Sequence, residues 1–354
     1  MKRIHIQTSQ SYDVLIEGGL LAQAGELLAE RFSPRTAVLL TDTTVDTLYA
    51  GQVADALARA GFRVLRYAFA GGESNKTLST VAEILAFLSQ NAVTRSDLLV
   101  ALGGGIVGDV VGFSAAVYLR GLRFVQIPTT FLAAIDASVG GKTGVNLPTG
   151  KNLAGAFWQP ACVLCDCETF RTLPRTVFLD GVAEAIKYGV LEDEALFNAL
   201  AASPEIADIE DVVFRCIQLK SRFVAEDERD VGQRQLLNLG HTLGHAIERV
   251  SGYQVSHGHG VAIGMVAAAR AAERLGYAKA PCSERIIAAL QTHGLPVSTS
   301  LPTNALLQAM TRDKKRTGAT LNLVLPERIG ACGIVPFAVD RLPEFIQAGL
   351  EGSV

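Results

Sequence analysis

Residue types able to coordinate, donate and titrate stand at helical spacing in the segment RQLLNLGHTLGHAIE, residues 234–248. If the segment is one helix, its leucines form a core-facing stripe. The opposite face then carries the polar groups Arg234, Asn238, His241 and His245. For one histidine alone, a hydrogen-bonded core residue is the commoner explanation, but an arginine and an asparagine on the same face favour a functional site. The segment also contains Gly240 and Gly244, each costing about 1 kcal/mol relative to alanine in a helix interior.

A glycine turn with dinucleotide-binding spacing occurs in DLLVALGGGIVGDVVGFSAA. Gly103, Gly105 and Gly108 fit G-x-G-x-x-G between a predicted strand and a predicted helix, where backbone amides can hold a pyrophosphate. The motif alone is weak evidence, because an ordinary strand-to-helix turn can have the same spacing. No acidic residue ends the next strand to bind a ribose, so Asp42, at the end of an earlier strand, is the candidate. A second turn, AGGESNKT, adds support because ligands bind at the carboxyl ends of parallel strands.

The stretch PTTFLAAIDASVGGKTGVN, followed by TGKNLAGAFWQP, is dense in glycine and polar residues. It places Asp136, Lys142, Lys151 and Asn152 among glycines without an apolar period. A glycine-rich loop with lysines suits phosphate recognition, since the backbone can approach closely and each lysine supplies a point charge. A flexible solvated loop is the alternative.

The elements that must position these groups change character along the chain. Up to about residue 178, the runs RTAVLLTD, FRVLRYAF, DLLVALGG, RFVQIPTT and ACVLCD alternate with helical stretches, which indicates a parallel sheet with crossover helices. From Asp180 onward long helical periods dominate, including a helix expected to begin near Gly260. We therefore predict an α/β Rossmann-like nucleotide-binding domain at residues 1–178 and a mainly α-helical metal-binding domain at residues 179–354.

Composition narrows the class of protein. The 354 residues include 32 Lys and Arg and 35 Asp and Glu, and this near-neutral charge argues against a nucleic-acid-binding protein. The amino terminus lacks the apolar segment of a signal peptide, and apolar runs are too short for a membrane span. We expect a cytoplasmic protein without a membrane segment. Cys162, Cys165 and Cys167 could suggest a metal site, but a short buried strand is favoured because such zinc sites need four ligands.

Taken together, these segments resemble the 3-dehydroquinate synthase family of sugar-phosphate cyclases. The likeness runs from Thr36 to about residue 330 and rests on the blocks GGESNKT, GGGIVGDVVGFSAAVYLRG, IPTTFLAAIDASVGGKTGVN, GKNLAGAFWQP, GVAEAIKYG, RQLLNLGHTLGHAIE and RDKK. The resemblance implies a homodimer that uses NAD and Zn²⁺ or Co²⁺. It also implies a place in the shikimate pathway, towards chorismate and the aromatic amino acids.

The implied reaction converts 3-deoxy-D-arabino-heptulosonate 7-phosphate into 3-dehydroquinate and phosphate. NAD⁺ takes a hydride from the C5 hydroxyl while zinc polarises that oxygen, and phosphate then leaves. Hydride returns, the ring opens and an intramolecular aldol reaction closes the carbocycle. The cofactor is therefore regenerated, and the resemblance implies a carbon–oxygen lyase that uses NAD catalytically.

Site residues follow from the resemblance position by position. The implied metal ligands are Glu184, His241 and His257. The positions implied to contact substrate or phosphate are Arg120, Lys142, Asn152, Lys187, Lys220, Arg234, Asn238, His245 and one of Lys314 and Lys315, with Arg120 reaching the partner subunit's phosphate. The positions implied to bind NAD are Asp42, Gly71, Gly72, Glu73, Ser74, Asn75, Lys76, Gly105, Ile106, Val107, Gly108, Asp109, Thr129, Thr130, Asp136, Lys142, Lys151, Thr169, Phe170, Arg171 and Thr172.

One departure from the family pattern concerns His259. The family usually reads H-G-E where this chain reads His257-Gly258-His259, so His259 is a supporting partner, a surface residue or a rival ligand to His257. Other interpretations are a sibling cyclase such as 2-deoxy-scyllo-inosose synthase, and a metal-dependent polyol dehydrogenase that releases NADH. A non-catalytic scaffold protein would have a damaged site, whereas the positions above are intact.

Overall fold

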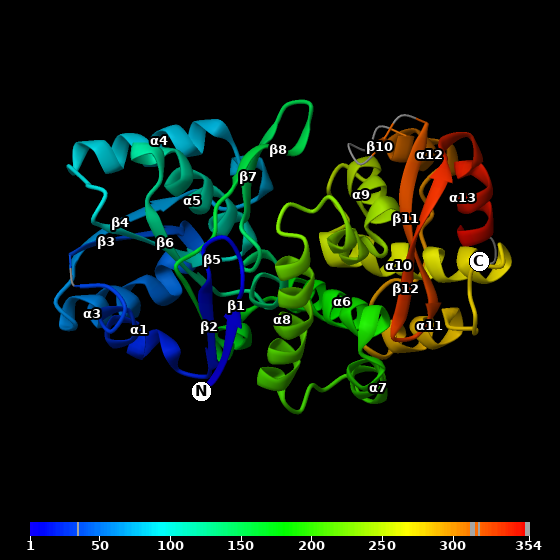
Figure 1. The fold of residues 1–354 in the computed structure, drawn as a ribbon, viewed down its shortest axis with the longest axis horizontal. Helices are drawn as coiled ribbons and strands as arrows, with labels where there is room; N and C mark the ends of the chain where they lie inside the picture. The colour runs from blue at the N-terminus through cyan, green and yellow to red at the C-terminus, as the bar shows by residue number, and fades with distance from the viewer. Residues whose placement is uncertain (34, 312–315, 318, 351–354) are drawn as a thin grey trace. The chain divides into compact units, whose positions relative to one another are not determined.

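The computed structural model describes residues 1–33, 35–311, 316–317 and 319–350. Its internal contacts divide the chain into two compact units (Figure 1). Unit 1 comprises Met1–Pro174 with Ile209–Arg229, and unit 2 comprises Arg175–Asp208 with Asp230–Val354.

Unit 1 is built on a seven-stranded sheet in the order β1-β2-β9-β6-β5-β3-β4. Its strands are β1 (Lys2–Ile6), β2 (Tyr12–Glu17), β3 (Thr36–Asp42), β4 (Arg63–Phe69), β5 (Leu98–Gly103), β6 (Arg123–Pro128) and β9 (Cys162–Asp166). Every neighbouring pair is parallel except β1 with β2. The predicted parallel sheet is confirmed, and Cys162 and Cys165 are buried on strand β9, as the strand interpretation expected.

Helices cover both faces of this sheet (Figure 1). They are α1 (Leu20–Ala29), α2 (Thr43–Val45) and α3 (Gly51–Arg59), then α4 (Leu78–Gln90) and α5 (Gly105–Val117). Strand β3 shows the division, because Ala37 and Leu39 join the core with α1 and α3, whereas Val38 and Leu40 join the core with α4 and α5. Burial on both faces explains why the inner strands β3, β5 and β9 read as nearly continuous apolar runs. Each fully buried aliphatic side chain contributes about 1.5–3 kcal/mol to the free energy of unfolding, relative to an exposed one.

The glycine-rich segment expected as a loop is a hairpin. Strands β7 (Lys142–Leu147) and β8 (Gly150–Phe157) pair antiparallel, with Gly144 opposite Gly155. A Cβ atom on Gly155 would lie 2.1 Å from the Thr143 carbonyl oxygen, so glycine is needed here for close approach of the strands. The loop prediction was wrong because small residues that suit a phosphate loop also suit a tightly paired hairpin.

Helix α8 (Ile209–Glu226) packs with unit 1, although the sequence suggested a single boundary after residue 178. The side chain of Glu210 accepts a hydrogen bond from the Gly18 amide at 2.8 Å, and Lys2 pairs with Asp211 at 3.2 Å. Helical periodicity identified the helix. Periodicity alone does not show which unit the apolar face of that helix packs against. The contacts above show that it packs against unit 1.

Unit 2 is mainly helical, as predicted. Its helices are α6 (Arg175–Glu192), α7 (Glu194–Ala202), α9 (His241–Val250), α10 (His257–Arg274), α11 (Ser283–Thr292), α12 (Thr303–Thr311) and α13 (Leu342–Leu350). Helix α10 lies at the centre and packs against α6, α9, α11 and α13. A three-stranded antiparallel sheet, which the sequence interpretation did not include, is formed by β10 (Arg316–Thr317), β11 (Thr320–Arg328) and β12 (Ala331–Ala338).

Two helix boundaries in unit 2 differ from expectation. The segment 234–248 is not one helix: a 3₁₀ turn at Gln233–Asn238 precedes Gly240, whose φ of 75° ends that turn, and α9 starts afresh at His241. Only a glycine adopts this left-handed conformation without strain. Helix α10 begins at His257 rather than near Gly260, so His257 lies in its first turn.

Among the residues described, no helix has both the length and the apolar character needed to cross a bilayer.

Candidate metal centre and nucleotide edge

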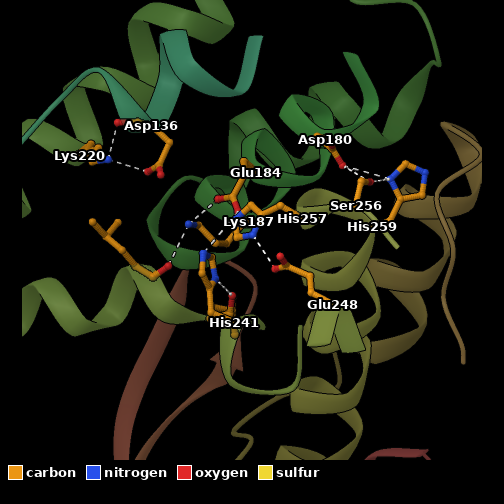
Figure 2. Close-up of polar contacts among 12 residues, drawn as sticks. Asp136, Asp180, Glu184, Lys187, Lys220, His241, Glu248, Ser256, His257 and His259 are labelled. Atoms are coloured by element: carbon orange, nitrogen blue, oxygen red, sulfur yellow. Dashed lines mark hydrogen bonds and ion pairs between the residues drawn. The ribbon is translucent and has the colours of Figure 1, made fainter. Parts of the chain in front are cut away.

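Three potential metal ligands from three helices of unit 2 converge on one point (Figure 2). Glu184 lies on α6, His241 is the first residue of α9 and His257 is the first residue of α10. The Nε2 atoms of His241 and His257 lie 3.5 Å and 3.3 Å from Oε1 of Glu184. These are the three residues that the resemblance implied as ligands.

The spacing of these atoms fits a metal ion better than it fits hydrogen bonds. A tetrahedral zinc ion with bonds of about 2.0–2.1 Å holds neighbouring ligand atoms about 3.3 Å apart. The Glu184 carboxylate is fully buried, and neither oxygen makes a hydrogen bond of good geometry to the described residues. Oε2 pairs with the Lys187 ammonium at 2.5 Å, whereas Oε1 faces the two imidazoles. A buried carboxylate is costly unless a cation or donors compensate it. The donor set of one carboxylate and two imidazoles also matches catalytic zinc.

Both histidines are held so that Nε2 faces Glu184. His241 Nδ1 lies 3.0 Å from the Leu239 carbonyl oxygen, and His257 Nδ1 lies 2.9 Å from Oε1 of Glu248. An oxygen acceptor at Nδ1 places the proton there and leaves the Nε2 lone pair for a metal. These oxygens therefore select the tautomer that coordination requires.

Glu248 is a functional candidate that the sequence reasoning missed. Burial alone would lower the pKa of His257, but the carboxylates of Glu184 and Glu248 raise that pKa to about 10. A proton and a metal ion therefore compete for the same imidazole. Glu248 follows His241 and His245 at i+7 and i+3 on α9, so the helical period could have identified it.

The glycines of α9 and α10 allow these helices to approach closely. A Cβ atom on Gly264 would lie 2.0 Å from the Gly240 carbonyl oxygen, and one on Gly244 would lie 3.0 Å from the Gly260 carbonyl carbon. Small residues four apart on each helix therefore face small residues on the other. This contact explains the glycines inside α9 and α10, which are unfavourable in helix propensity, because close packing brings His241 and His257 within reach of one ion.

Lys187 holds the opposite side of the carboxylate. Its Nζ lies 2.5 Å from Oε2 of Glu184 and donates to the Leu237 carbonyl oxygen at 2.9 Å. The 3₁₀ turn that carries Arg234 and Asn238 thus contacts the metal centre through Leu237. The Arg234 side chain is buried, with 2% of its residue surface exposed. A buried guanidinium keeps its charge and suits recognition of a carboxylate.

His245 lies one turn after His241 and is exposed. Its ring centre is 5.4 Å from that of His241 and 5.8 Å from that of His257. A second group of potential ligands consists of His245, Glu248 and His257. The two groups share His257, whose Nδ1 already contacts Glu248, so Nε2 on the Glu184 side is the atom available for coordination.

In unit 1 the implied NAD positions lie along the carboxyl edge of the parallel sheet. Asp42 ends β3, which lies between β4 and β5. Residues 71–76 follow β4, residues 105–109 follow β5, Thr129 and Thr130 follow β6, and residues 169–172 follow β9. The chain order reverses between β3 and β5, and ligands of open α/β sheets bind at such a switch point. Asp42 is therefore next to the glycine turn, although it belongs to an earlier strand.

The start of α5 has the features of an anion site. Gly104 occupies the N-cap position without a side-chain cap, so the first amides of the helix are not satisfied by a capping side chain. Gly108 packs against β6, since a Cβ atom there would lie 2.5 Å from Oε1 of Gln126. Thr129 Oγ1 is buried and makes no hydrogen bond within the described part of the chain. An NAD molecule at this edge could supply its missing partner.

Polar contacts tie the loop after β4 to α5 and the hairpin. Lys76 Nζ lies 2.5 Å from Oδ2 of Asp109 and 2.6 Å from Oδ1 of Asn152. Burial raises the pKa of Asp109, against the opposing influence of the Lys76 ammonium. Lys151 lies 3.6 Å from Oε1 of Glu73. Lys76 thus joins the loop after β4 both to α5 and to the hairpin.

The remaining candidates of unit 1 differ in their surroundings. Lys220 of α8 donates to the backbone oxygen of Asp136 at 2.5 Å and to its Oδ1 at 2.7 Å. Asp42 Oδ1 caps α2 by accepting from the Thr44 and Val45 amides. The buried side chains are Thr169 and Phe170, and the exposed ones are Lys142, Arg171 and Thr172. Lys314 and Lys315 lie outside the described residues.

Arg120 is exposed on a turn with unusual backbone conformation. Leu119 and Arg120 have φ values of 50° and 63°, although neither is glycine. Such residues cost about 1–3 kcal/mol each and are concentrated at functional sites. The turn is fixed by a hydrogen bond from Arg95 Nε to the Leu119 carbonyl oxygen at 3.1 Å.

Comparison with known proteins identifies two adjacent family matches. Residues 66–180 match the profile described as 3-dehydroquinate synthase N-terminal, and residues 181–316 match 3-dehydroquinate synthase C-terminal. The chain is 45% identical over 343 residues to the curated 3-dehydroquinate synthase of Streptococcus gordonii (strain Challis), which covers 95% of this chain and 97% of the relative.

Two solved structures have the same fold. A 2-deoxy-scyllo-inosose synthase complexed with carbaglucose-6-phosphate, NAD⁺ and Co²⁺ has a TM-score of 0.87 at 24% identity, covering 99% of this chain and 100% of that one. The 2-epi-5-epi-valiolone synthase from Streptomyces hygroscopicus subsp. jinggangensis, with NAD⁺ and Zn²⁺ bound, has a TM-score of 0.87 at 26% identity, covering 97% and 98%.

Proposed function

The chain belongs to the 3-dehydroquinate synthase family, and we propose that it converts 3-deoxy-D-arabino-heptulosonate 7-phosphate into 3-dehydroquinate and inorganic phosphate. The observation that carries this proposal is the convergence of Glu184, His241 and His257, at the spacing of metal ligands, in a chain that matches this family. The overall reaction combines transient oxidation, loss of phosphate, re-reduction and aldol closure. Its class is therefore that of a carbon–oxygen lyase.

We assign Glu184 through a carboxylate oxygen, and His241 and His257 through Nε2, as ligands of Zn²⁺ or Co²⁺. When bound, this ion supplies Lewis-acid polarisation of a substrate hydroxyl, and NAD supplies reversible hydride transfer. Three protein ligands leave open coordination positions, as catalytic zinc sites do. The related 2-epi-5-epi-valiolone synthase, with NAD⁺ and Zn²⁺ bound, supports both cofactors.

Charged and polar side chains would bind and orient the sugar acid. Arg234 supplies a permanent positive charge for the substrate carboxylate, while Asn238 and Lys220 supply donors for its carboxylate and hydroxyls. Lys187 keeps the Glu184 carboxylate in place through the 2.5 Å ion pair. His245 carries an exposed imidazole, a group that accepts and releases protons near neutral pH. We assign it to proton transfer or substrate contact rather than to coordination.

The carboxyl edge of the sheet in unit 1 would bind NAD. The amides at the start of α5 suit the pyrophosphate, and the Asp42 carboxylate suits a ribose hydroxyl. The buried hydroxyl of Thr129, which has no partner among the described residues, supports a ligand at this edge. Lys142 and Asn152 are assigned to phosphate handling. Lys314 and Lys315, of which one would share this role, lie outside the described residues.

We further propose a homodimer in which Arg120 reaches the phosphate site of the partner subunit. The strained, exposed turn at Leu119 and Arg120 supports a role that requires this conformation. Val117 and Leu119 are 43% and 40% exposed beside it, which is consistent with an apolar contact surface. The cytoplasmic location stays a prediction from the sequence.

The decisive assay incubates the protein with the heptulosonate phosphate, Zn²⁺ and a small, limiting amount of NAD⁺. Phosphate should accumulate to many equivalents of the NAD⁺ supplied, because the cofactor is regenerated in each cycle. Stoichiometric NADH, seen as absorbance at about 340 nm, would instead favour a polyol dehydrogenase. A parallel reaction with glucose 6-phosphate tests the sibling cyclase, whose activity would release phosphate from that sugar instead.

A further inference from the structure

A second polar network joins the two helices that carry Glu184 and His257 (Figure 2). Ser256 Oγ lies 2.6 Å from Oδ1 of Asp180 and 2.7 Å from Nδ1 of His259. His259 Nδ1 also lies 3.2 Å from Oδ1 of Asp180. Asp180 belongs to α6, whereas Ser256 and His259 flank the first residue of α10.

The direction of these hydrogen bonds can be assigned. A carboxylate only accepts, so the Ser256 hydroxyl donates to Asp180 and its oxygen accepts from His259 Nδ1–H. A serine nucleophile would instead give its proton to the imidazole. The network is therefore not a hydrolytic triad, and its geometry is that of a tie between helices.

Ser256 stands at the N-cap of α10, but its side chain makes no capping hydrogen bond to the described first turn. A serine at this position usually accepts from an amide of the first helical turn. Here the hydroxyl is used for Asp180 and His259 instead. The first turn of α10 is thus held by α6 rather than by its own cap.

The helix backbones touch at the same place. A Cβ atom on Gly258 would lie 2.3 Å from the Asp180 Cα atom. Asp180 and Glu184 are one turn apart on α6, so they share a face of that helix. Ser256 and His259 lie on either side of His257 in the chain. The network and the glycine contact therefore fix α10 against α6 where the two proposed ligands face each other.

We propose that Asp180, Ser256 and His259 are positioning residues, which set the separation of Glu184 and His257 for metal binding. This inference rests on the proposed metal centre. The two ligand atoms are 3.3 Å apart, and metal–ligand distances tolerate deviations of only about 0.2 Å. A small rotation of the first turn of α10 would therefore weaken coordination while both helices stay folded.

The test measures Co²⁺ affinity by titration and the visible absorption spectrum of the Co²⁺-loaded full-length protein. Ser256→Ala and His259→Ala should each weaken Co²⁺ binding by about 10–100-fold and change the spectrum, as supporting residues of metal sites do. His259→Asn should restore most of the affinity and the parent spectrum, because its side-chain N–H lies close to the position of Nδ1.

A matched control is Ser283→Ala, in unit 2. Ser283 Oγ donates to Oε2 of Glu273 at 2.7 Å, so this change also removes a serine-to-carboxylate hydrogen bond at the start of a helix. It should leave Co²⁺ affinity and spectrum unchanged. If Ser256→Ala does not fold, the pair His259→Ala and His259→Asn decides the question.

Three results would overturn the inference. Parent-like affinity and spectrum in the alanine variants would show that the network does not position the ligands. An equal loss in Ser283→Ala would show a general effect of stability. If the parent chain binds no Co²⁺, the proposed metal centre fails and the positioning role fails with it, whereas intact binding in all variants defeats only the positioning role.

Discussion

The metal centre of unit 2 and the nucleotide edge of unit 1 are built in different ways. Three helices in close packing supply Glu184, His241 and His257, with their ligand atoms already close together. The nucleotide edge instead takes its groups from the turns after several parallel strands. A metal ion requires a few atoms at fixed distances, whereas a dinucleotide is long enough to contact many turns.

This difference predicts how each site responds to a single change. Loss of one ligand removes one of the three side chains that would hold the ion. A change in the packing of α9 against α10 moves His241 and His257 directly. Loss of one contact to NAD leaves the other turns in place. Substitutions in the metal centre should therefore have larger effects than comparable substitutions at the nucleotide edge.

The largest effect is expected for His241→Ala. Two ligands cannot hold the ion in place, so metal affinity and activity should fall by more than the roughly 100-fold upper range for supporting residues. Metal analysis of the purified protein and phosphate release measure the two losses. His5→Ala, at an exposed histidine of β1, is the control and should change neither. Parent-level metal content in His241→Ala would remove this residue from the ligand set.

A smaller loss is expected when the contact between α9 and α10 is overfilled. Gly264→Ala places a Cβ atom 2.0 Å from the Gly240 carbonyl oxygen, so the helices must separate. Overpacking of this kind typically costs about 1–3 kcal/mol of unfolding free energy, and metal affinity should fall as well.

Gly51→Ala is the matched control for that change. Gly51 lies in helix α3, where an added Cβ atom would meet none of the described residues within 4 Å, and replacing glycine in a helix stabilises by about 0.4–1 kcal/mol. Urea unfolding and metal titration compare the two variants. Equal stability of both would show that the glycine contact does not constrain the helices.

At the nucleotide edge, Asp42→Asn should weaken NAD binding by about tenfold. Asparagine keeps the cap on the Thr44 and Val45 amides but removes the charge of the ribose acceptor, whose hydrogen bond contributes about 1.5–3 kcal/mol at most. Metal content should not change. Equilibrium titration with NAD⁺ tests this prediction. The control is Asp46→Asn, which removes the charge of a nearby carboxylate that pairs with Arg66 at 2.6 Å. A loss comparable to that of His241→Ala would contradict the distributed character of this site.

The smallest effect is expected at His293, a histidine of unit 2 that we assign a structural role and no part in metal binding. His293 is buried, and burial lowers its pKa from the usual 6.5, with a hydrogen bond from Nε2 to the Leu200 carbonyl oxygen at 2.8 Å. The folded state therefore disfavours the protonated form, so this residue's contribution to stability is full above about pH 6.5 and is lost as pH falls.

His293→Gln removes this titration while an amide N–H can still reach Leu200. The unfolding free energy of the variant should consequently depend less on pH between about 6.5 and 5 than that of the parent chain. His5→Gln, at an exposed position, should leave the slope unchanged. An unaltered slope in His293→Gln would show that this histidine is protonated equally in both states.

Much of unit 1 could be predicted because the inner strands of its large sheet are buried on both faces. Strands β3 and β5 are apolar along most of their length, and Gly103, Gly105 and Gly108 mark the turn from β5 into α5. The hairpin of β7 and β8 could not be predicted in this way, since glycine pairs such as Gly144 and Gly155 give no alternating apolar pattern.

Unit 2 shows where periodicity is insufficient. The leucines of segment 234–248 fit one continuous helix, and only the positive φ of Gly240 reveals that the helix restarts at His241. Resemblance identified Glu184, His241 and His257, which the structure brings together. Glu248 and the network of Asp180 with Ser256 were missed, because hydrogen bonds between different helices leave no pattern along the chain.

The central claim is that one ion binds where Glu184, His241 and His257 meet. Anomalous X-ray diffraction at the zinc edge, from crystals of the zinc-loaded protein, tests it most directly. We predict one peak about 2.0–2.2 Å from a Glu184 oxygen and from Nε2 of both histidines. A peak instead coordinated by His245 and Glu248, or by His259, would contradict the ligand assignment.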